Sequence, residues 1–141
     1  MKLPTKKEIN VFDTLDERVA CDHFYKKTLA EAEALFRENS LYYQEDLLWM
    51  GIKAFKFYLP SVINYLQSEY AAKDSDLINF LHEIIDFRSS EAGFSEALDS
   101  VNSLIDYVLA NYEKFEVDSA IYGNLHDKYQ DLQNQLKKRA A

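Results

Sequence analysis

Each of the three histidines in this chain stands beside an acidic residue, and histidine together with carboxylates forms many metal sites. The pairs are Asp22-His23, His82-Glu83 and His126-Asp127. Neighbouring residues on a helix point about 100° apart, so the two members of a pair do not bind one ion together. His82 and Asp86 share a helix face, but a catalytic zinc ion usually takes three protein ligands, and neither HExxH nor a Glu-x-x-His repeat occurs. We therefore predict no metal site.

Other residue types that perform catalysis form no recognised motif. The three glycines, Gly51, Gly93 and Gly123, are isolated, so the sequence contains no phosphate-binding loop and no dinucleotide fingerprint. No G-x-S-x-G elbow occurs, and Cys21 and His23 are two residues apart, a spacing that directs helical side chains away from each other. The sequence predicts no catalytic residues and no cofactor, and it favours a non-enzymatic protein.

The single cysteine bears on the cellular compartment. Cys21 has no second cysteine to pair with, so an internal disulfide is excluded and a reducing compartment is indicated. Its neighbour Asp22 would raise the pKa of the thiol rather than lower it. We expect a buried structural cysteine, with a reactive thiol as the alternative.

Tyrosine is the more informative excess in this sequence. Aromatic residues make up 14% of the chain, and tyrosine combines apolar area with a polar tip that suits the rim of an interface. The tyrosines at 42, 43, 58, 65 and 70 surround acidic residues in one stretch. The candidate partner-binding residues are Tyr42, Tyr43, Glu45, Asp46, Glu69 and Tyr70. In the alternative interpretation, these rings fill the core of a helical bundle.

The charge balance restricts the kinds of partner. The chain has 24 acidic and 16 basic residues, for a formal net charge of −8. Nucleic-acid binding is disfavoured because affinity for phosphates comes from clustered lysine and arginine. An acidic surface suits solubility or a basic protein partner. No segment reaches the roughly 20 apolar residues of a membrane span and the first ten residues lack an apolar run, so we expect a cytoplasmic protein without membrane attachment.

The elements that must position these residues are helices. Few glycines and prolines interrupt the chain, which disfavours a β-rich fold. The central stretch from Tyr42 to Tyr70 is predicted to form two helical pieces broken at Leu59-Pro60, because proline lacks an N–H and disfavours helical backbone before it. At Gly51, inside the first piece, we expect a kink or a close contact.

Further helices are predicted on both sides of the central stretch. The run from Asp13 should bury Leu15, Val19 and Phe24 and leave Asp16, Glu17 and Arg18 in water. Thr28 and Glu31 form a capping box, which predicts a helix from about Leu29 to Glu38. The later helices are expected from Ser75, over 98–112 with a regular apolar stripe, and from Asp118 with Ile121, Leu125, Tyr129, Leu132 and Leu136 inward. The prediction is an all-α, single-domain bundle of about five to seven helices over residues 1–141, with a Pro-broken central helix pair.

The segment FYLPSVINYL, preceded by EDLLWMG and followed by a helix start rich in Asp and Ser, resembles a group of small acidic α-helical bacterial proteins of unassigned function. The similarity covers mainly Asp13 to Arg88. Some members of this wider class are immunity proteins that neutralise a secreted toxin. The resemblance implies a bacterial cytoplasmic protein and transfers no site residues.

Two hypotheses of different classes follow. In the first, the chain is a protein-binding protein of the immunity or adaptor type, and its acidic, tyrosine-bearing surface is exposed and contiguous. In the second, it is a small-ligand or metal-binding bundle, possessing a cavity where His82, Glu83, Asp86 or His23 meets other carboxylates.

Overall fold

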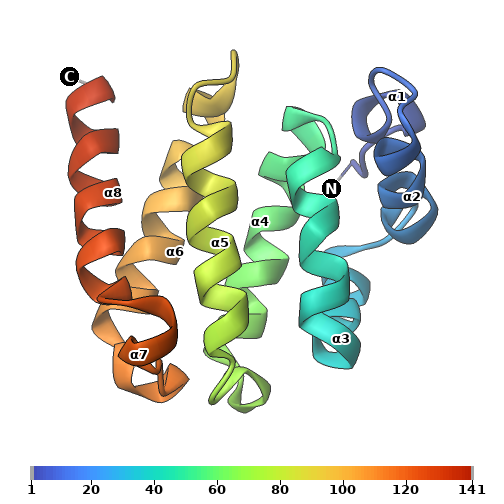
Figure 1. Cartoon of the computed structure of the whole chain (residues 1–141). Coiled ribbons are helices and arrows are strands. Elements are labelled where there is room, and N and C mark those ends of the chain that lie inside the picture. The colour runs from blue at the N-terminus through green and yellow to red at the C-terminus, as the bar shows by residue number, and fades with distance from the viewer. Residues whose placement is uncertain (1, 141) are drawn as a thin grey trace. The chain divides into compact units, whose positions relative to one another are not determined.

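The computed structural model describes residues 2–140, of which no part forms a strand. These described residues are 78% helical and form eight α-helices, six of them of seven or more residues, so the predicted all-α fold is confirmed. The α-helices are α1 Lys6–Ile9, α2 Leu15–Phe24, α3 Leu29–Trp49, α4 Ile52–Gln67, α5 Ser75–Arg88, α6 Leu98–Ala110, α7 Ser119–Tyr122 and α8 Leu125–Ala140 (Figure 1). Short 3₁₀ helices are η1 Glu69–Ala71, η2 Phe94–Ala97 and η3 Tyr112–Phe115.

Two compact units make up the chain. The first ends at Tyr65 and the second begins at Leu66, so the division falls near the end of α4. In the first unit, α2 packs against α1 and α3; in the second, α8 packs against α5 and α6. That residues 1–141 form one domain stays a prediction.

Capping boxes start the first three helices. In each, a threonine hydroxyl accepts a bond from a backbone N–H three residues on, and the glutamate there accepts one from the threonine N–H; the pairs are Thr5-Glu8, Thr14-Glu17 and Thr28-Glu31. The predicted box at Thr28 is confirmed. These reciprocal bonds satisfy backbone donors that the first helical turn leaves without partners.

Helix α3 consists of two segments that meet at Asn39, where the backbone leaves the helical conformation (φ −161°, ψ 88°). The side-chain Oδ1 of Asn39 accepts a hydrogen bond of 3.1 Å from the backbone N–H of Tyr42, as a residue capping a new helix does. The predicted end of a helix at Glu38 is confirmed as this kink. Asn39 therefore sets the direction of the segment that carries the tyrosine pair.

The predicted break at Leu59-Pro60 is wrong, because α4 runs through Pro60 without interruption. An internal proline costs a helix roughly 3 kcal/mol. Apolar side chains on both sides of it are fully buried, among them Phe55, Leu59 and Val62. Each fully buried apolar side chain stabilises the fold by about 1.5–3 kcal/mol. Several of them together outweigh the local preference of proline, so the helix stays continuous.

The chain breaks instead at Gly51, between α3 and α4, and the expected close contact there is confirmed. A Cβ at this position would lie 2.2 Å from the carbonyl oxygen of Glu8 and 2.7 Å from Cγ2 of Val11. The N–H of Gly51 donates to the carbonyl of Ile9 at 3.0 Å. Only a residue without a side chain lets the N-terminal segment approach this closely.

Aromatic rings form the centre of the first unit. The ring of Phe24 lies 5.0 Å from that of Tyr58 and 6.0 Å from that of Phe36, between centroids. Tyr58 is fully buried, and its hydroxyl shares its proton between the backbone carbonyl oxygens of Phe24 (2.8 Å) and Lys27 (2.9 Å). These bonds fix the turn between α2 and α3 to the middle of α4.

The predicted inner face of α2 is wrong except for Phe24. Leu15 is 74% exposed and Val19 is exposed, whereas Glu17, expected in water, is buried. The residues that face inward are Glu17, Ala20 and Phe24, which recur at helical spacing. Compared with the prediction, α2 is rotated about its own axis, because the carboxylate of Glu17 finds its hydrogen-bond donors in the preceding loop.

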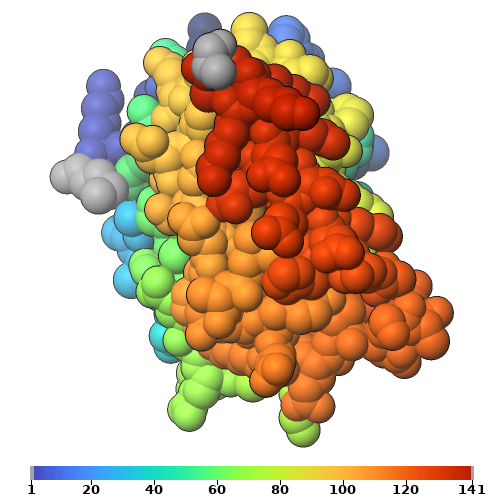
Figure 2. All heavy atoms as spheres, turned by 90° about the vertical axis from the view of Figure 1, so that its left-hand side faces the viewer, coloured from blue at the N-terminus to red at the C-terminus, as the bar shows by residue number. Residues whose placement is uncertain are grey.

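In the second unit, α8 buries Leu125, Tyr129, Leu132 and Leu136, as predicted. Figure 2 shows the red atoms of α8 lying against the lighter orange atoms of α6. Ile121 is exposed instead, because Gly123, whose backbone has a positive φ of +67°, separates α7 from α8. Within residues 2–140, no helix has both the length and the apolar character needed to cross a bilayer.

Candidate functional site

A buried carboxylate orients a histidine between α2 and α3. The Oδ2 of Asp46 lies 2.6 Å from Nδ1 of His23, and Asp46 is only 4% exposed. On its other side, Nε2 of His23 lies 3.3 Å from the hydroxyl of Tyr42. Carboxylate, imidazole and phenol thus follow one another from the interior of the first unit to its surface.

Two tyrosine rings enclose the imidazole. The ring centroid of His23 lies 5.2 Å from that of Tyr42 and 5.0 Å from that of Tyr43, and the two tyrosine rings meet edge to face at 4.9 Å. Edge contacts of this kind stabilise aromatic pairs by about 0.5–1.5 kcal/mol beyond their buried area. We call His23, Tyr42, Tyr43 and Asp46 the histidine-tyrosine cluster.

Burial and charge perturb the acidic groups of this cluster. Burial raises the pKa of Asp46 from 3.8 to about 6, against the opposing effect of its hydrogen bond to His23. Burial also raises the pKa of Tyr43, and the negative charge of Glu38 acts in the same direction. Both groups therefore hold their protons more tightly than they do in water.

The structure divides the predicted partner-binding residues. Tyr42 is 54% exposed and Glu45 is exposed, while Tyr43 is half-buried. The prediction of Asp46 on an exposed surface is wrong, because its side chain points towards α2, where His23 provides a hydrogen-bond partner for the carboxylate. The other two predicted residues are exposed in the second unit, at Glu69 and Tyr70.

The tyrosines therefore divide between the core and the surface. Tyr58 and Tyr65 fill the core, as the alternative interpretation expected, whereas Tyr42 and Tyr70 present more than half of their area to solvent. Spacing did not predict His23 as the partner of Tyr42, since the two are far apart in sequence. The carboxylate that contacts His23 is that of Asp46, not that of its sequence neighbour Asp22.

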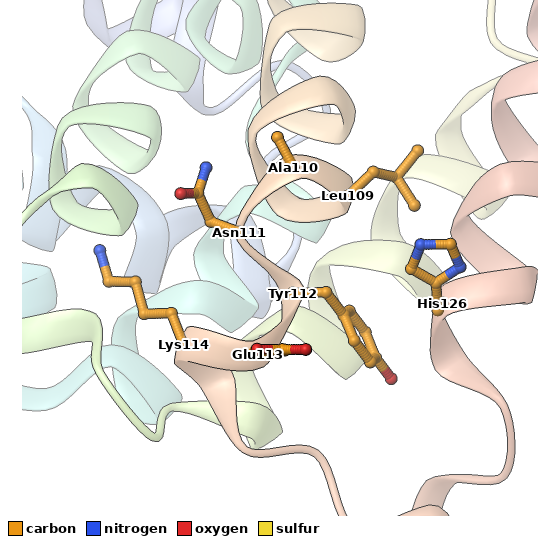
Figure 3. Close-up of a pocket in the computed structure, with 7 residues that line it drawn as sticks. All are labelled: Leu109, Ala110, Asn111, Tyr112, Glu113, Lys114 and His126. Atoms are coloured by element: carbon orange, nitrogen blue, oxygen red, sulfur yellow. The ribbon is translucent and has the colours of Figure 1, made fainter.

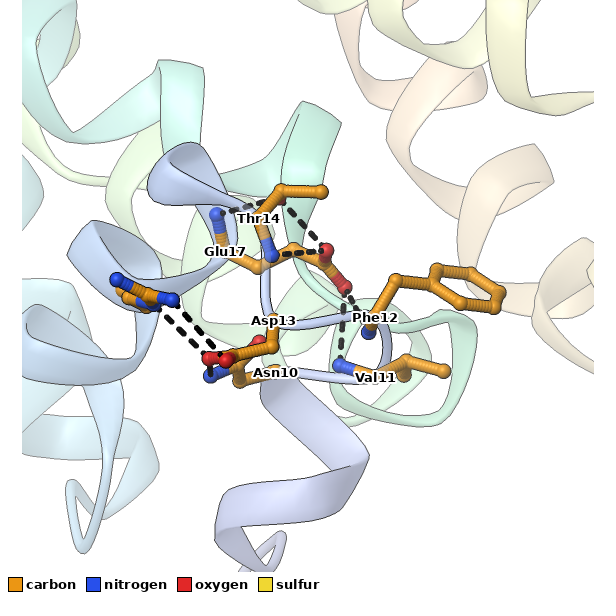
Figure 4. A network of polar contacts seen from close by, with 7 residues as sticks. Asn10, Val11, Phe12, Asp13, Thr14 and Glu17 are labelled. Atoms are coloured by element: carbon orange, nitrogen blue, oxygen red, sulfur yellow. Dashed lines mark hydrogen bonds and ion pairs between the residues drawn. The ribbon is translucent and has the colours of Figure 1, made fainter.

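A second polar network shapes the loop between α1 and α2 (Figure 4). The carboxylate of Glu17 accepts hydrogen bonds from the backbone N–H groups of Val11 (2.9 Å), Phe12 (3.0 Å) and Thr14 (3.2 Å), and from the Thr14 hydroxyl (2.7 Å). Asp13 adopts a positive φ of 58°. The loop is held in this conformation with Phe12 projecting outward, 84% exposed.

A shallow hollow of about 470 Å³ lies on the second unit where α6 ends (Figure 3). The rings of Tyr112 and His126 meet edge to face on one side of it, with centroids 5.2 Å apart. Burial raises the pKa of Tyr112. Lys114 also lines the hollow, but its ammonium donates to the carbonyl of Leu66 and to the hydroxyl of Tyr107.

Among the other residues considered for chemistry, His82 has a structural contact. Nε2 of His82 lies 3.2 Å from the carbonyl oxygen of Lys128, and Glu83 and Asp86 are exposed. Among residues 2–140, no three His, Cys, Asp or Glu side chains come together as metal ligands. Cys21 is half-buried rather than buried, and desolvation together with the charge of Asp22 raises the pKa of its thiol, as expected.

Comparison of the chain with protein-family models, curated proteins and solved structures finds no match.

Proposed function

We propose that this chain is a non-enzymatic protein-binding protein of the immunity or adaptor type, acting in the bacterial cytoplasm, and that the first unit binds a basic protein around Tyr42. The observation that carries the proposal is an exposed aromatic ring held in one orientation. Tyr42 contacts His23 and Tyr43, and His23 is anchored on buried Asp46. Ordered aromatic side chains of this kind provide much of the affinity of protein interfaces at little entropic cost.

The charges around Tyr42 favour a basic partner. Glu45 lies three residues after Tyr42 and shares its helix face, and both are exposed. Asp22 and Glu38 are exposed on the adjoining parts of α2 and α3. Negative charges at the rim of an interface accelerate association with a cationic partner and lose their effect as salt increases. Asp46 contributes by holding His23 rather than by touching the partner.

The test is affinity capture of basic proteins from the native lysate at low and high salt, with four variants compared in parallel. Tyr42→Ala removes the ring and Glu45→Gln removes one charge. The matched controls are Phe87→Ala and Glu96→Gln, which make the same kinds of change at exposed positions of the second unit. We expect a basic protein that binds wild type and both controls, binds Tyr42→Ala and Glu45→Gln several-fold more weakly, and dissociates at high salt.

A capture pattern that is identical for all four variants would refute binding at Tyr42. Loss of the partner in Phe87→Ala alone would move the interface to the second unit, where Glu69 and Tyr70 are exposed.

Small-ligand binding is a second candidate, favoured by the hollow at Tyr112 and His126. Its volume lies in the range of about 300–1,000 Å³ that small-molecule sites occupy. Proton NMR of the His126 imidazole during titration with a fragment library tests this candidate. Resonances that do not shift would exclude binding of those compounds beside this ring.

A further inference from the structure

The order of groups in the histidine-tyrosine cluster is that of an activated nucleophile. In such sites, a base touches the nucleophilic hydroxyl and is itself oriented by a third group. Here Nε2 of His23 lies 3.3 Å from the hydroxyl of Tyr42, and Nδ1 lies 2.6 Å from the carboxylate of Asp46. The three groups come from α2 and from the second segment of α3.

The buried carboxylate determines where the imidazole proton resides. An ionised carboxylate only accepts hydrogen bonds, so Nδ1 of His23 carries the proton that faces Asp46. In the neutral imidazole, Nε2 then has a free lone pair directed at Tyr42, and the tyrosine hydroxyl donates to it. The imidazolium formed by proton transfer is stabilised by the negative charge of Asp46 beside it.

The hydroxyl is also accessible and its ring is ordered. Tyr42 is 54% exposed, so a molecule in solution reaches it. The ring of Tyr43 supports both Tyr42 and His23, and the side chain of Asn39 fixes the backbone of Tyr42 at the kink of α3. Accessibility and a positioned base are the two conditions for a reactive hydroxyl.

We propose that Tyr42 is a nucleophilic tyrosine, with His23 as its base and Asp46 as the positioning residue for His23, and that it accepts an acyl group from an uncharged activated ester. The proton of the Tyr42 hydroxyl moves to Nε2 of His23 as the phenolic oxygen bonds to the acyl carbon. The bond from the acyl carbon to the ester oxygen then breaks, and the proton on Nε2 passes to the departing oxygen. The products are O-acyl-Tyr42 and the hydroxyl compound that leaves the activated ester, such as a nitrophenol.

Surface charge selects an uncharged donor. The exposed carboxylates of Asp22, Glu38 and Glu45 lie on the elements that carry the cluster. They repel phosphoryl donors, which are anionic, and leave a neutral ester unaffected. The modification is stoichiometric and stands independently of the proposed protein binding.

The experiment is acetylation of the whole chain by p-nitrophenyl acetate at neutral pH, followed by peptide mass spectrometry at successive times. Tyr70, which is 61% exposed, is the internal reference, because labelling governed by exposure alone would acetylate it at least as fast as Tyr42. Neutral hydroxylamine separates tyrosine esters, which it cleaves, from lysine amides. We expect Tyr42 to be acetylated at least about tenfold faster than Tyr70. This threshold is set below the roughly 100- to 10,000-fold acceleration that a positioned general base usually gives.

In His23→Gln, the ratio of the two rates should fall to about one, and in Asp46→Asn it should fall part of the way. Tyr42→Phe should abolish the modification at this position. A ratio near one in wild type overturns the proposal without reference to any variant. An unchanged ratio of the two acetylation rates in His23→Gln also overturns the proposal, provided that this variant keeps the helical content of wild type.

Discussion

Replacement of Glu17 by alanine should destabilise the first unit more than loss of an ordinary helix cap does. The carboxylate accepts four hydrogen bonds, three from backbone N–H groups of residues 11–14 and one from a hydroxyl, and Glu17 is 4% exposed. A hydrogen bond to a charged group contributes about 1.5–3 kcal/mol, and bonds that share one acceptor are less than additive. We expect the free energy of unfolding to fall by about 3–5 kcal/mol.

The matched control is Glu31→Ala, because Glu31 forms the same capping box with Thr28 but is exposed. Losing a cap alone costs about 0.5–2 kcal/mol, so the difference between the variants measures the bonds from the α1–α2 loop. Urea denaturation followed by far-UV circular dichroism gives both values. Equal losses in Glu17→Ala and Glu31→Ala would refute the assigned role of the buried network.

The effect of Glu17 should also depend on pH. Burial acts to raise the pKa of this carboxyl, but its hydrogen bonds from Thr14, Phe12 and Val11 outweigh burial and hold the pKa below the ordinary 4.5. The folded state thus binds the proton less tightly than the unfolded state does. The stabilisation is present in full above pH 4.5 and disappears as the pH falls through the folded-state pKa, so wild type and Glu17→Ala should converge in acid.

Three further changes test other contacts. Burial raises the pKa of Asp46 from 3.8 to about 6, so the folded state loses stability as the pH rises between these two values. Over this range the unfolding free energy of wild type should fall by up to about 3 kcal/mol relative to that of Asp46→Asn. A difference between the two proteins that stays constant with pH in urea denaturation would contradict this prediction. Gly51→Ala places a methyl group against Glu8 and should cost about 1–3 kcal/mol, whereas an unchanged melting temperature would show that α1 moves away freely. Tyr58→Phe removes the hydroxyl that donates to two backbone carbonyls and should lower the free energy of unfolding by about 1–3 kcal/mol. Wild-type stability of this variant in calorimetry would contradict the prediction.

The features predicted correctly are those determined within a few residues of sequence. The capping box at Thr28 needs only Glu31 three positions later, and the kink after Glu38 needs only a residue that caps a new helix. The apolar stripe of α8 follows from helical spacing alone. The histidine-tyrosine cluster was beyond such reasoning, because His23 meets Asp46 only after α2 packs on α3.

Proline and glycine show how packing modifies local preference. Pro60 was predicted to break a helix, but buried side chains on both sides of it keep α4 continuous. At Gly51 a kink or a close contact was predicted, and the structure has both. The helices α3 and α4 are separate there, and the N-terminal segment occupies the place of the missing side chain. Tertiary contact decides both cases. At Pro60 it overcomes the backbone preference, and at Gly51 it requires the residue that allows close approach.

The capping box of α2 follows a signal recognised elsewhere in the chain, but the burial of Glu17 does not follow from it, since Glu31 in the same kind of box is exposed. Thr14 and Glu17 have the spacing of Thr28 and Glu31, so the same capping argument would have turned Glu17 towards its own N-terminal turn. Once Glu17, Ala20 and Phe24 face inward, helical geometry requires Leu15 and Val19 to face outward. A buried carboxylate thereby leaves apolar side chains on the surface, and hydrophobic spacing alone assigns such a helix the wrong face.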